Sequence, residues 1–352
     1  MIIMPDLQER QSRTIDQLRF PMAALVVLLH TAALGLNSTY PVYSTLSIAL
    51  GRGICRIAVP CFFLISGYLF FSKLEDKWDT DVWFDKLKKR VRTLLIPYLL
   101  WNVIAAVAIW GYRWIFAQIH GETYPGFFDH IAQMRGLWDY AGVLPFDGPL
   151  WFIRHLMLLV IAAPLVWLFV KHLRIWGLLA LILVFIFVGY IPEGVVFFSA
   201  GALFRVENKN MLREFDRIKY WAIALSILSL VALTIAYRNY PDLYRATGNV
   251  FILAGTVVLF LLAGLAAGKG KKACPLLVQS SFFIFAAHDI LILHDFSHWI
   301  ILHLLPFQRE WMECVDLFLR PTIAIAICLV LYKLMDRFTP KTLSLLTGGR
   351  GR

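Results

Sequence analysis

Long apolar segments are the feature of this 352-residue sequence that most restricts its fold. Hydrophobic residues make up 59% of the chain, more than is usual in soluble domains, and the mean hydropathy is +0.68. The excess lies in blocks of roughly 17–25 residues, the length of helix that crosses about 30 Å of hydrocarbon. We therefore predict an all-α polytopic membrane protein with about ten transmembrane helices. The predicted spans cover residues 19–36, 48–71, 94–115, 150–170, 175–190, 195–204, 220–237, 250–267, 280–298 and 318–332.

The net charge of +11 is distributed along the chain in a way that indicates membrane topology. If the N-terminus is cytoplasmic, 25 of the 34 lysines and arginines fall in predicted inner segments and five in predicted outer segments. This surplus follows the positive-inside rule and predicts that both termini are cytoplasmic. A nucleic-acid-binding protein would instead gather its positive charge on one soluble face, so the distribution argues against that class.

A single membrane domain is expected over residues 1–352. No cleavable signal peptide is predicted, because charged residues precede the first apolar run and no small-residue cleavage site follows it. Of the five cysteines, only Cys314 falls in a predicted outer loop, and no Cys/His spacing typical of a metal site occurs. The sequence therefore indicates neither a disulfide framework nor a structural metal.

Two ionisable residues, Arg19 and His30, lie eleven positions apart in the first span. Steps of about 100° per residue bring both to within about 20° of one helix face, about 16 Å apart along the axis. His30 is a side chain that can exchange a proton near neutral pH, and ionisable groups at membrane depth are usually functional. An interhelical hydrogen bond worth roughly 0.6 kcal/mol is the structural alternative. Asp16 lies one turn before Arg19 and can pair with it.

A basic run precedes the third span, with the sequence Lys86-Leu87-Lys88-Lys89-Arg90-Val91-Arg92. Under one interpretation the run anchors the topology beside anionic lipid headgroups. Under the other it binds a phosphorylated cytoplasmic ligand. The sequence leaves both interpretations open.

Four arginines fall near the outer ends of predicted spans, namely Arg52, Arg56, Arg154 and Arg320. Snorkelling to the interface explains each of them alone. Together they suggest an outward-facing cavity for an anionic or sugar-rich ligand. In the second span, Ser66 either packs against a neighbouring helix or lines a substrate path.

A polar segment follows the apolar part of the ninth span and contains His288, Asp289, His294 and His298. His294 and His298 have an i,i+4 spacing that can bind a metal, but no third ligand completes such a site. We predict a polar network at the outer end of this span and no metal ion.

These motifs resemble acyltransferase family 3, the bacterial integral-membrane acyltransferases. The signature of that family is an arginine, ten residues and then a histidine in the first span, which Arg19 and His30 match. Weaker similarities follow in the same order along nearly the whole chain. They are Phe62–Tyr68, Arg90-x-Arg92 with Ile96-Pro97-Tyr98, Leu150-Trp151-Phe152-Ile153, and Phe283–His288.

The resemblance implies an enzyme of the bacterial inner membrane that transfers an acyl group, usually acetyl, from cytoplasmic acyl-CoA. The implied acceptor is a hydroxyl of a cell-surface or lipid-linked carbohydrate, and no cofactor is permanently bound. His30 is expected to act as a general base, with direct attack preferred over an acyl-histidine intermediate. The residues expected on the donor side are Arg19, Lys88, Lys89, Arg90 and Arg92. Those expected on the acceptor side are Arg52, Arg56, Ser66, Trp151, Arg154, His288 and Arg320.

An exporter of polysaccharides or lipid-linked sugars is the alternative function. Proton-coupled transport commonly uses acidic residues at the membrane midplane. Here the centres of the predicted spans are nearly free of Asp and Glu, with Asp289 as the main exception. The sequence therefore favours the enzyme.

Overall fold

The computed structural model describes residues 7–75, 77–134, 146–189, 191–304 and 309–350, and this part of the chain contains helices and no strand. The predicted all-α class is thereby confirmed. The longer helices are α1 (Leu7–Leu34), α3 (Ala58–Phe70), α4 (Thr80–Arg90), α5 (Ile96–Ile119), α7 (Trp151–Ile161), α8 (Ala163–Phe187), α9 (Glu193–Val206), α11 (Lys219–Ala236), α12 (Pro241–Gly268), α13 (Pro275–Ala287) and α15 (Glu310–Phe338). The short ones are α2 (Pro41–Ser47), α6 (Phe127–Met134), α10 (Met211–Arg217), α14 (His298–Leu304) and α16 (Pro340–Leu346). Single turns of π-helix occupy Ile48–Gly53, Val91–Leu95 and Ile292–Ser297, and 3₁₀ turns occupy Ile54–Ile57 and Gly148–Leu150.

Local sequence explains where many of these helices begin. Pro41, Pro241, Pro275 and Pro340 stand at the first position of α2, α12, α13 and α16, where a missing backbone N–H has no consequence. The side chain of Asp79 caps α4 by accepting hydrogen bonds from two backbone amides. Tertiary packing of the apolar faces then holds the helices together.

Seven helical segments of the described chain are long and apolar enough to cross a membrane. They are Gln8–Leu34, Pro41–Phe70, Thr80–Ile119, Ala163–Phe187, Lys219–Ala236, Pro241–Gly268 and Glu310–Phe338. A bent pair, Pro275–Ala287 with Ile292–His303, makes eight if it is counted as one span, and its two halves meet at 89°. The protein is therefore a multi-pass membrane protein, with fewer long apolar helices than the ten spans expected.

The difference from ten lies between residues 150 and 204. The expected span at 150–170 covers α7, which has 11 residues, and the first part of α8, and the expected span at 175–190 covers the part of α8 that follows the break in helical geometry at Arg174. The expected span at 195–204 is α9, which has 14 residues. Its buried side chains include Val196 and Phe198, which pack inside the bundle. A short helix can thus be apolar because protein surrounds it, and hydropathy alone does not separate that case from a span.

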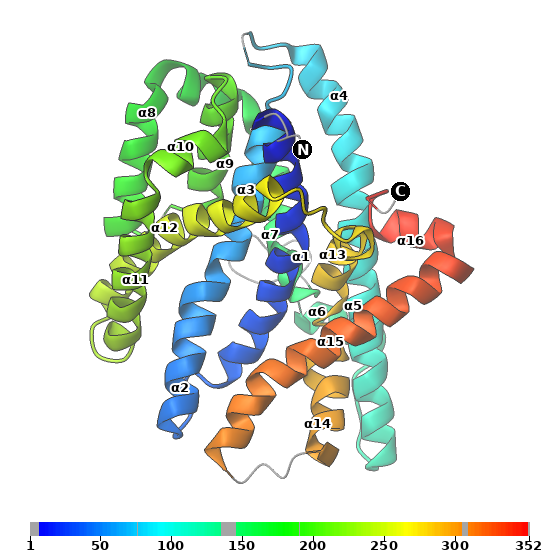
Figure 1. The fold of residues 1–352 in the computed structure, drawn as a ribbon. Helices are drawn as coiled ribbons and strands as arrows, with labels where there is room; N and C mark the ends of the chain where they lie inside the picture. Colours follow the sequence, from blue (N-terminus) through cyan, green and yellow to red (C-terminus); the bar gives the residue numbers. More distant parts are fainter. Residues whose placement is uncertain (1–6, 76, 135–145, 190, 305–308, 351–352) are drawn as a thin grey trace.

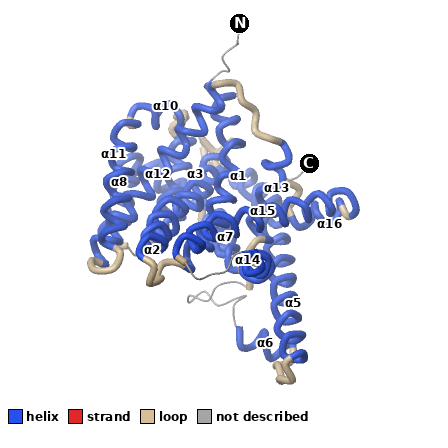
Figure 2. Tube along the Cα trace, turned by 60° about the horizontal axis from the view of Figure 1, so that its bottom comes forward, coloured by secondary structure: helices blue, strands red, loops and turns tan. Residues whose placement is uncertain are grey.

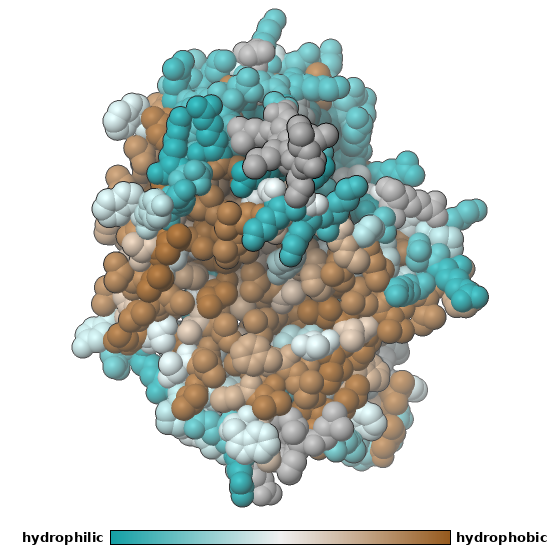
Figure 3. Space-filling view, in the orientation of Figure 1, coloured by the Kyte–Doolittle hydropathy of each residue, from teal (hydrophilic) through white to brown (hydrophobic). Residues whose placement is uncertain are grey.

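Helix α1 runs through the middle of the bundle (Figure 1) and contacts α3, α12, α13 and α15. Its side chains Leu18, Met22, Ala23 and Val27 are at most 1% exposed. In the tube view, α5 and α6 extend away from the rest of the bundle (Figure 2). A broad hydrophobic band separates two hydrophilic rims on the visible face of the molecule (Figure 3). Helices α1 and α4 both begin near the upper hydrophilic rim. From there, α1 runs down across the hydrophobic band.

Two glycines allow α3 and α9 to touch backbone to backbone. A Cβ added at Gly67 would overlap the carbonyl group of Phe198, and one added at Gly201 would overlap the carbonyl oxygen of Leu64. Small residues at helix crossings permit this close approach in membrane proteins. The contact fixes α3, which carries Phe62 and Ser66, relative to the rest of the bundle.

We predict that Gly201→Ala lowers the free energy of unfolding by about 1–3 kcal/mol, because the added methyl group forces the two backbones apart. The measurement is thermal unfolding in detergent, followed by the loss of the monodisperse protein. Gly111→Ala in α5 is the matched control, since a Cβ at that position meets no atom within 4 Å. Equal melting temperatures for Gly201→Ala and the wild type would refute the role of this contact.

Candidate active site

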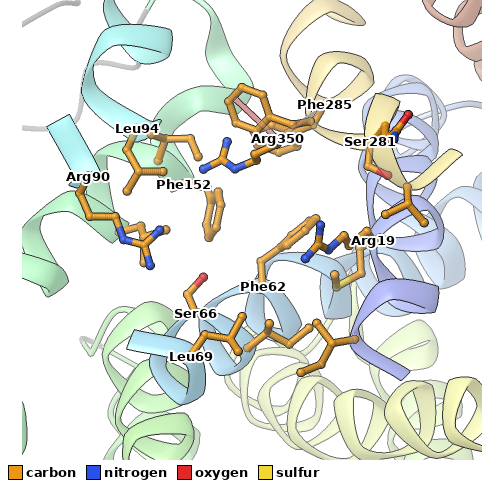
Figure 4. A pocket seen from close by; sticks show the side chains of 18 residues that line it. Arg19, Phe62, Ser66, Leu69, Arg90, Leu94, Phe152, Ser281, Phe285 and Arg350 are labelled. Carbon is orange, nitrogen blue, oxygen red and sulfur yellow. The ribbon is translucent and has the colours of Figure 1, made fainter. Parts of the chain in front are cut away.

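A cavity of about 260 Å³ opens between α1, α3, α4, α7, α13 and the turn that follows α16. The guanidinium groups of Arg19, Arg90 and Arg350 point into it from three separate segments (Figure 4). Its remaining wall is mainly apolar and aromatic. The lining residues are Ile15, Met22, Phe62, Ile65, Ser66, Leu69, Leu94, Phe152, Ile153, Leu156, Val278, Gln279, Ser281, Phe282 and Phe285. The cavity therefore combines concentrated positive charge with an apolar surface.

The three arginines differ in their partners. Arg19 is paired with Asp16 at 3.4 Å, and its side chain is 41% exposed. Arg350 lies over the ring of Phe282, with its guanidinium carbon 4.2 Å from the ring centroid. Burial, together with the positive charges of Arg90 and Arg19, lowers the pKa of Arg350 to about 9, so its guanidinium is still charged at neutral pH. The charge of Arg350 therefore adds to those of Arg19 and Arg90 at the cavity.

The structure divides the residues that the sequence assigned to the donor. Arg19 and Arg90 meet at the cavity. Lys88, Lys89 and Arg92 are exposed and are not among its lining residues, and Lys88 lies 3.8 Å from Asp85 on its own helix. Successive residues of a helix point in different directions, so only some residues of a basic run face the interior. The sequence of the run does not show which ones do.

A second group of polar side chains surrounds His30, farther along α1. The ring centroids of His30 and His288 are 5.2 Å apart. The Nε2 atom of His294 lies 3.2 Å from a carboxylate oxygen of Asp289. The helical path breaks after α13, where Leu291 adopts a φ of 60° and the two helical halves meet at 89°, and this bend places His294 beside Asp289. Broken helices of this kind bring polar backbone and side chains into a membrane protein's interior.

The hydrogen bonds of His288 indicate its tautomer. Its Nδ1 atom lies 3.0 Å from the carbonyl oxygen of Ile284 and 2.9 Å from that of Phe285. Because a carbonyl oxygen only accepts, Nδ1 carries the hydrogen, and Nε2 of the neutral ring is an acceptor. This Nε2 is buried, and no hydrogen-bond partner for it is found among the described residues. The ring is therefore fixed in place and has one acceptor to offer.

His30, Asp289 and His294 also place one ligand atom each within 4.8 Å of one another. Two imidazole nitrogens and a carboxylate oxygen are a ligand set that divalent cations accept. The contact between Asp289 and His294 instead engages these groups with each other. The sequence offered His294 and His298 as a metal pair without a third ligand, whereas the structure groups His294 with His30 and Asp289.

Asp147 is a buried acid that the sequence analysis did not single out. It is 1% exposed, and neither of its carboxylate oxygens has a hydrogen-bond partner among the described residues. The next residue, Gly148, approaches Asp289, since an added Cβ would lie 3.3 Å from a carboxylate oxygen of that residue. The sequence Asp147-Gly148-Pro149 is typical of a turn. Its position beside the histidine cluster results from tertiary folding and is not visible in the sequence.

The arginines expected on the acceptor side occupy different surroundings. Arg56 lies 3.6 Å from Glu193, and Arg52 lies over the ring of Tyr237 at 5.9 Å. Arg320 is hydrogen-bonded to Asp316 through Nε at 3.0 Å, and the two side chains are only 7% and 1% exposed.

Four further residues were expected on the acceptor side, and one of them, His288, lies instead against His30. Trp151 and Arg154 are partly buried on α7. Ser66 lines the same cavity as Arg19, and thus lies with the residues that were expected on the donor side.

Comparison of the sequence with known proteins identifies the family of this chain. The family model for the acyltransferase domain, acyltransferase family 3, matches residues 13–333, and the chain belongs to this family. The family predicted from the motifs is thereby confirmed. The chain is also similar to the succinoglycan biosynthesis protein ExoH of Rhizobium meliloti (strain 1021), with 29% identity over 336 residues, which cover 88% of this chain and 84% of that protein. No solved structure matches the chain.

Proposed function

We propose that this membrane acyltransferase moves an acyl group, with acetyl as the first candidate, from cytoplasmic acyl-CoA to a carbohydrate hydroxyl. The acceptor we propose is a cell-surface or lipid-linked glycan. Membership in the acyltransferase family supports acyl transfer rather than sugar export. The name of the similar protein, which places it in succinoglycan biosynthesis, supports a glycan acceptor.

One observation carries the proposal. Arg19 lines the three-arginine cavity, and His30 joins the histidine cluster, while both belong to the single helix α1. Eleven residues of helix separate them by about 16 Å along the axis. CoA carries phosphates at one end and the thioester at the end of a long flexible arm. The cavity suits the phosphates, and the cluster at His30 suits the thioester.

The proposed reaction is a direct transfer. His30 accepts the proton of the acceptor hydroxyl, whose oxygen attacks the thioester carbonyl carbon. The carbon–sulfur bond then breaks, the thiolate leaves, and the imidazolium of His30 returns the proton to the sulfur. Histidine suits this work because an unperturbed imidazole exchanges a proton near neutral pH.

His288 and Asp289 are proposed to position His30. The ring of His288 is held by two carbonyl oxygens and lies against His30, which restricts the rotation of the catalytic ring. The carboxylate of Asp289 is close enough to stabilise the imidazolium that forms during the reaction. Arg52, Arg56, Arg154 and Arg320 remain our candidates for the acceptor side.

We propose that the protein lies in the bacterial inner membrane with both termini in the cytoplasm, and the positive charge of the predicted inner loops supports this orientation. Reporter domains inserted at Lys77, at Glu122 and after the last residue should read inside, outside and inside. Alkaline phosphatase, active only outside, and a green fluorescent protein, bright only inside, give opposite signals at each site. An outside signal at the end of the chain would contradict this topology.

The proposal is tested by incubating membranes that contain the protein with acyl-CoA labelled in its acyl group. Label is expected in the glycan fraction. Membranes from cells without the gene provide the background.

A further inference from the structure

The turn after α16 is fixed against the rest of the protein. Trp101 of α5 donates a hydrogen bond from its indole nitrogen to the carbonyl oxygen of Leu346 at 3.0 Å. Gly348 and Gly349 have φ values of +61° and +73°, in the left-handed region that residues other than glycine rarely adopt. A Cβ at Gly348 would lie 2.5 Å from the carbonyl oxygen of Thr93. These contacts hold the backbone of the turn and direct the residue that follows it.

That residue is Arg350, which reaches the cavity from the top of the close-up view, between Arg90 on the left and Arg19 on the right (Figure 4). Its guanidinium lies against the face of Phe282, and its Nη1 atom is buried with no hydrogen-bond partner among the described residues. None of the residues that line the cavity is acidic. A buried cationic donor without a partner is unfavourable, and an anionic ligand in the cavity would supply the missing acceptor.

We propose that Arg350 binds a phosphate group of the CoA donor together with Arg19 and Arg90, an inference that rests on the proposed function. The three arginines come from segments that lie far apart in the sequence and meet only in this cavity. Their charges face apolar and aromatic side chains that can accept the pantetheine arm. A phosphate of a lipid headgroup has the same chemistry, and the experiment below separates the two sources.

The full-length protein in uncharged detergent is titrated calorimetrically with CoA and with pantetheine, which lacks the phosphates. Arg350→Ala is expected to weaken CoA binding by about ten- to a hundredfold, since a hydrogen bond to a charged group is lost. Binding of pantetheine is expected to stay unchanged. Arg350→Lys should recover only part of the CoA affinity, because the planar fork of the guanidinium is missing. Arg337→Ala is the matched control, an exposed arginine at the end of α15 that does not line the cavity.

The alternative outcomes are distinct. Equal losses for CoA and pantetheine in Arg350→Ala would mean that Arg350 only supports the fold, which overturns the inference. Unchanged CoA binding in Arg350→Ala, with a loss in Arg19→Ala, would overturn it and leave the proposed function intact. A loss of binding to a spin-labelled phosphatidylglycerol without a loss for CoA would assign Arg350 to lipid instead. Failure of the wild type to bind CoA would refute the proposed donor and this inference together.

Discussion

Replacing His30 with alanine is expected to lower the rate of acyl transfer by about 10²–10⁴-fold, the usual loss when general-base catalysis is removed. The reason is structural as well as chemical. His30 is the imidazole on α1 that faces His288 and lies beside Asp289 and His294. Its own helix is held by apolar contacts of Leu18, Met22 and Val27, which the substitution leaves in place.

The measurement is the initial rate of acylation in membranes with equal amounts of protein, determined for His30→Ala and for His172→Ala. His172 lies on α8, is exposed, and is absent from both the cavity and the histidine cluster. The control should retain the wild-type rate and both variants should remain monodisperse in detergent. A wild-type rate in well-folded His30→Ala protein would eliminate His30 as the base.

Arg19→Ala is expected to weaken CoA binding by about ten- to a hundredfold, because a charged hydrogen bond to phosphate is lost. Arg19→Lys should restore only part of this affinity, since lysine lacks the bidentate fork. Arg154→Ala provides the contrast, because Arg154 lies on α7 outside the cavity. It should leave CoA binding intact and lower acylation of the glycan.

CoA affinity in detergent and acylation in cells are measured for the same three variants. If donor and acceptor sides are assigned correctly, Arg19→Ala lowers the CoA affinity. Arg154→Ala keeps the CoA affinity and lowers acylation of the glycan. Normal CoA binding in Arg19→Ala, combined with a loss in Arg154→Ala, would reverse the two sides.

Much of the site on α1 could be predicted from the sequence. Helical periodicity alone predicts that Arg19 and His30 share one face, and the structure places Arg19 at the cavity and His30 against His288 on the same helix. His288 was recognised as part of a late motif, but its contact with His30 joins residues 258 positions apart. Such contacts depend on tertiary packing, which no local pattern encodes.

No comparable sequence signal points to Arg350 or Asp147. Arg350 follows a Gly-Gly turn in a segment that resembles a loose tail, and only the contacts with Thr93 and Trp101 fix it at the cavity. Asp147 stands in a polar connection and becomes buried through the fold. A charged residue in a polar segment is normally solvated, so sequence reasoning passes over it.

The membrane class was readily predicted, whereas the count of long helices was not. Apolar blocks of sufficient length indicate membrane helices reliably when lipid surrounds them. Between residues 150 and 204, however, the chain forms α7 and α9, which are short, and α8, which is interrupted at Arg174, and the apolar residues of α9 pack against other helices. Hydropathy measures the preference for an apolar environment and does not distinguish lipid from protein.

The central claim is that His30 acts as the general base when an acyl group passes from CoA to a glycan hydroxyl. The most direct measurement uses inside-out membrane vesicles, in which the cytoplasmic face is accessible, and a series of acyl-labelled CoA donors beginning with acetyl-CoA. Wild-type vesicles are predicted to place label in alkali-labile ester linkage on the glycan, and His30→Ala vesicles are predicted to match vesicles without the protein. Equal labelling of the glycan by wild-type and His30→Ala vesicles, or no labelling above background with any donor, would contradict the account.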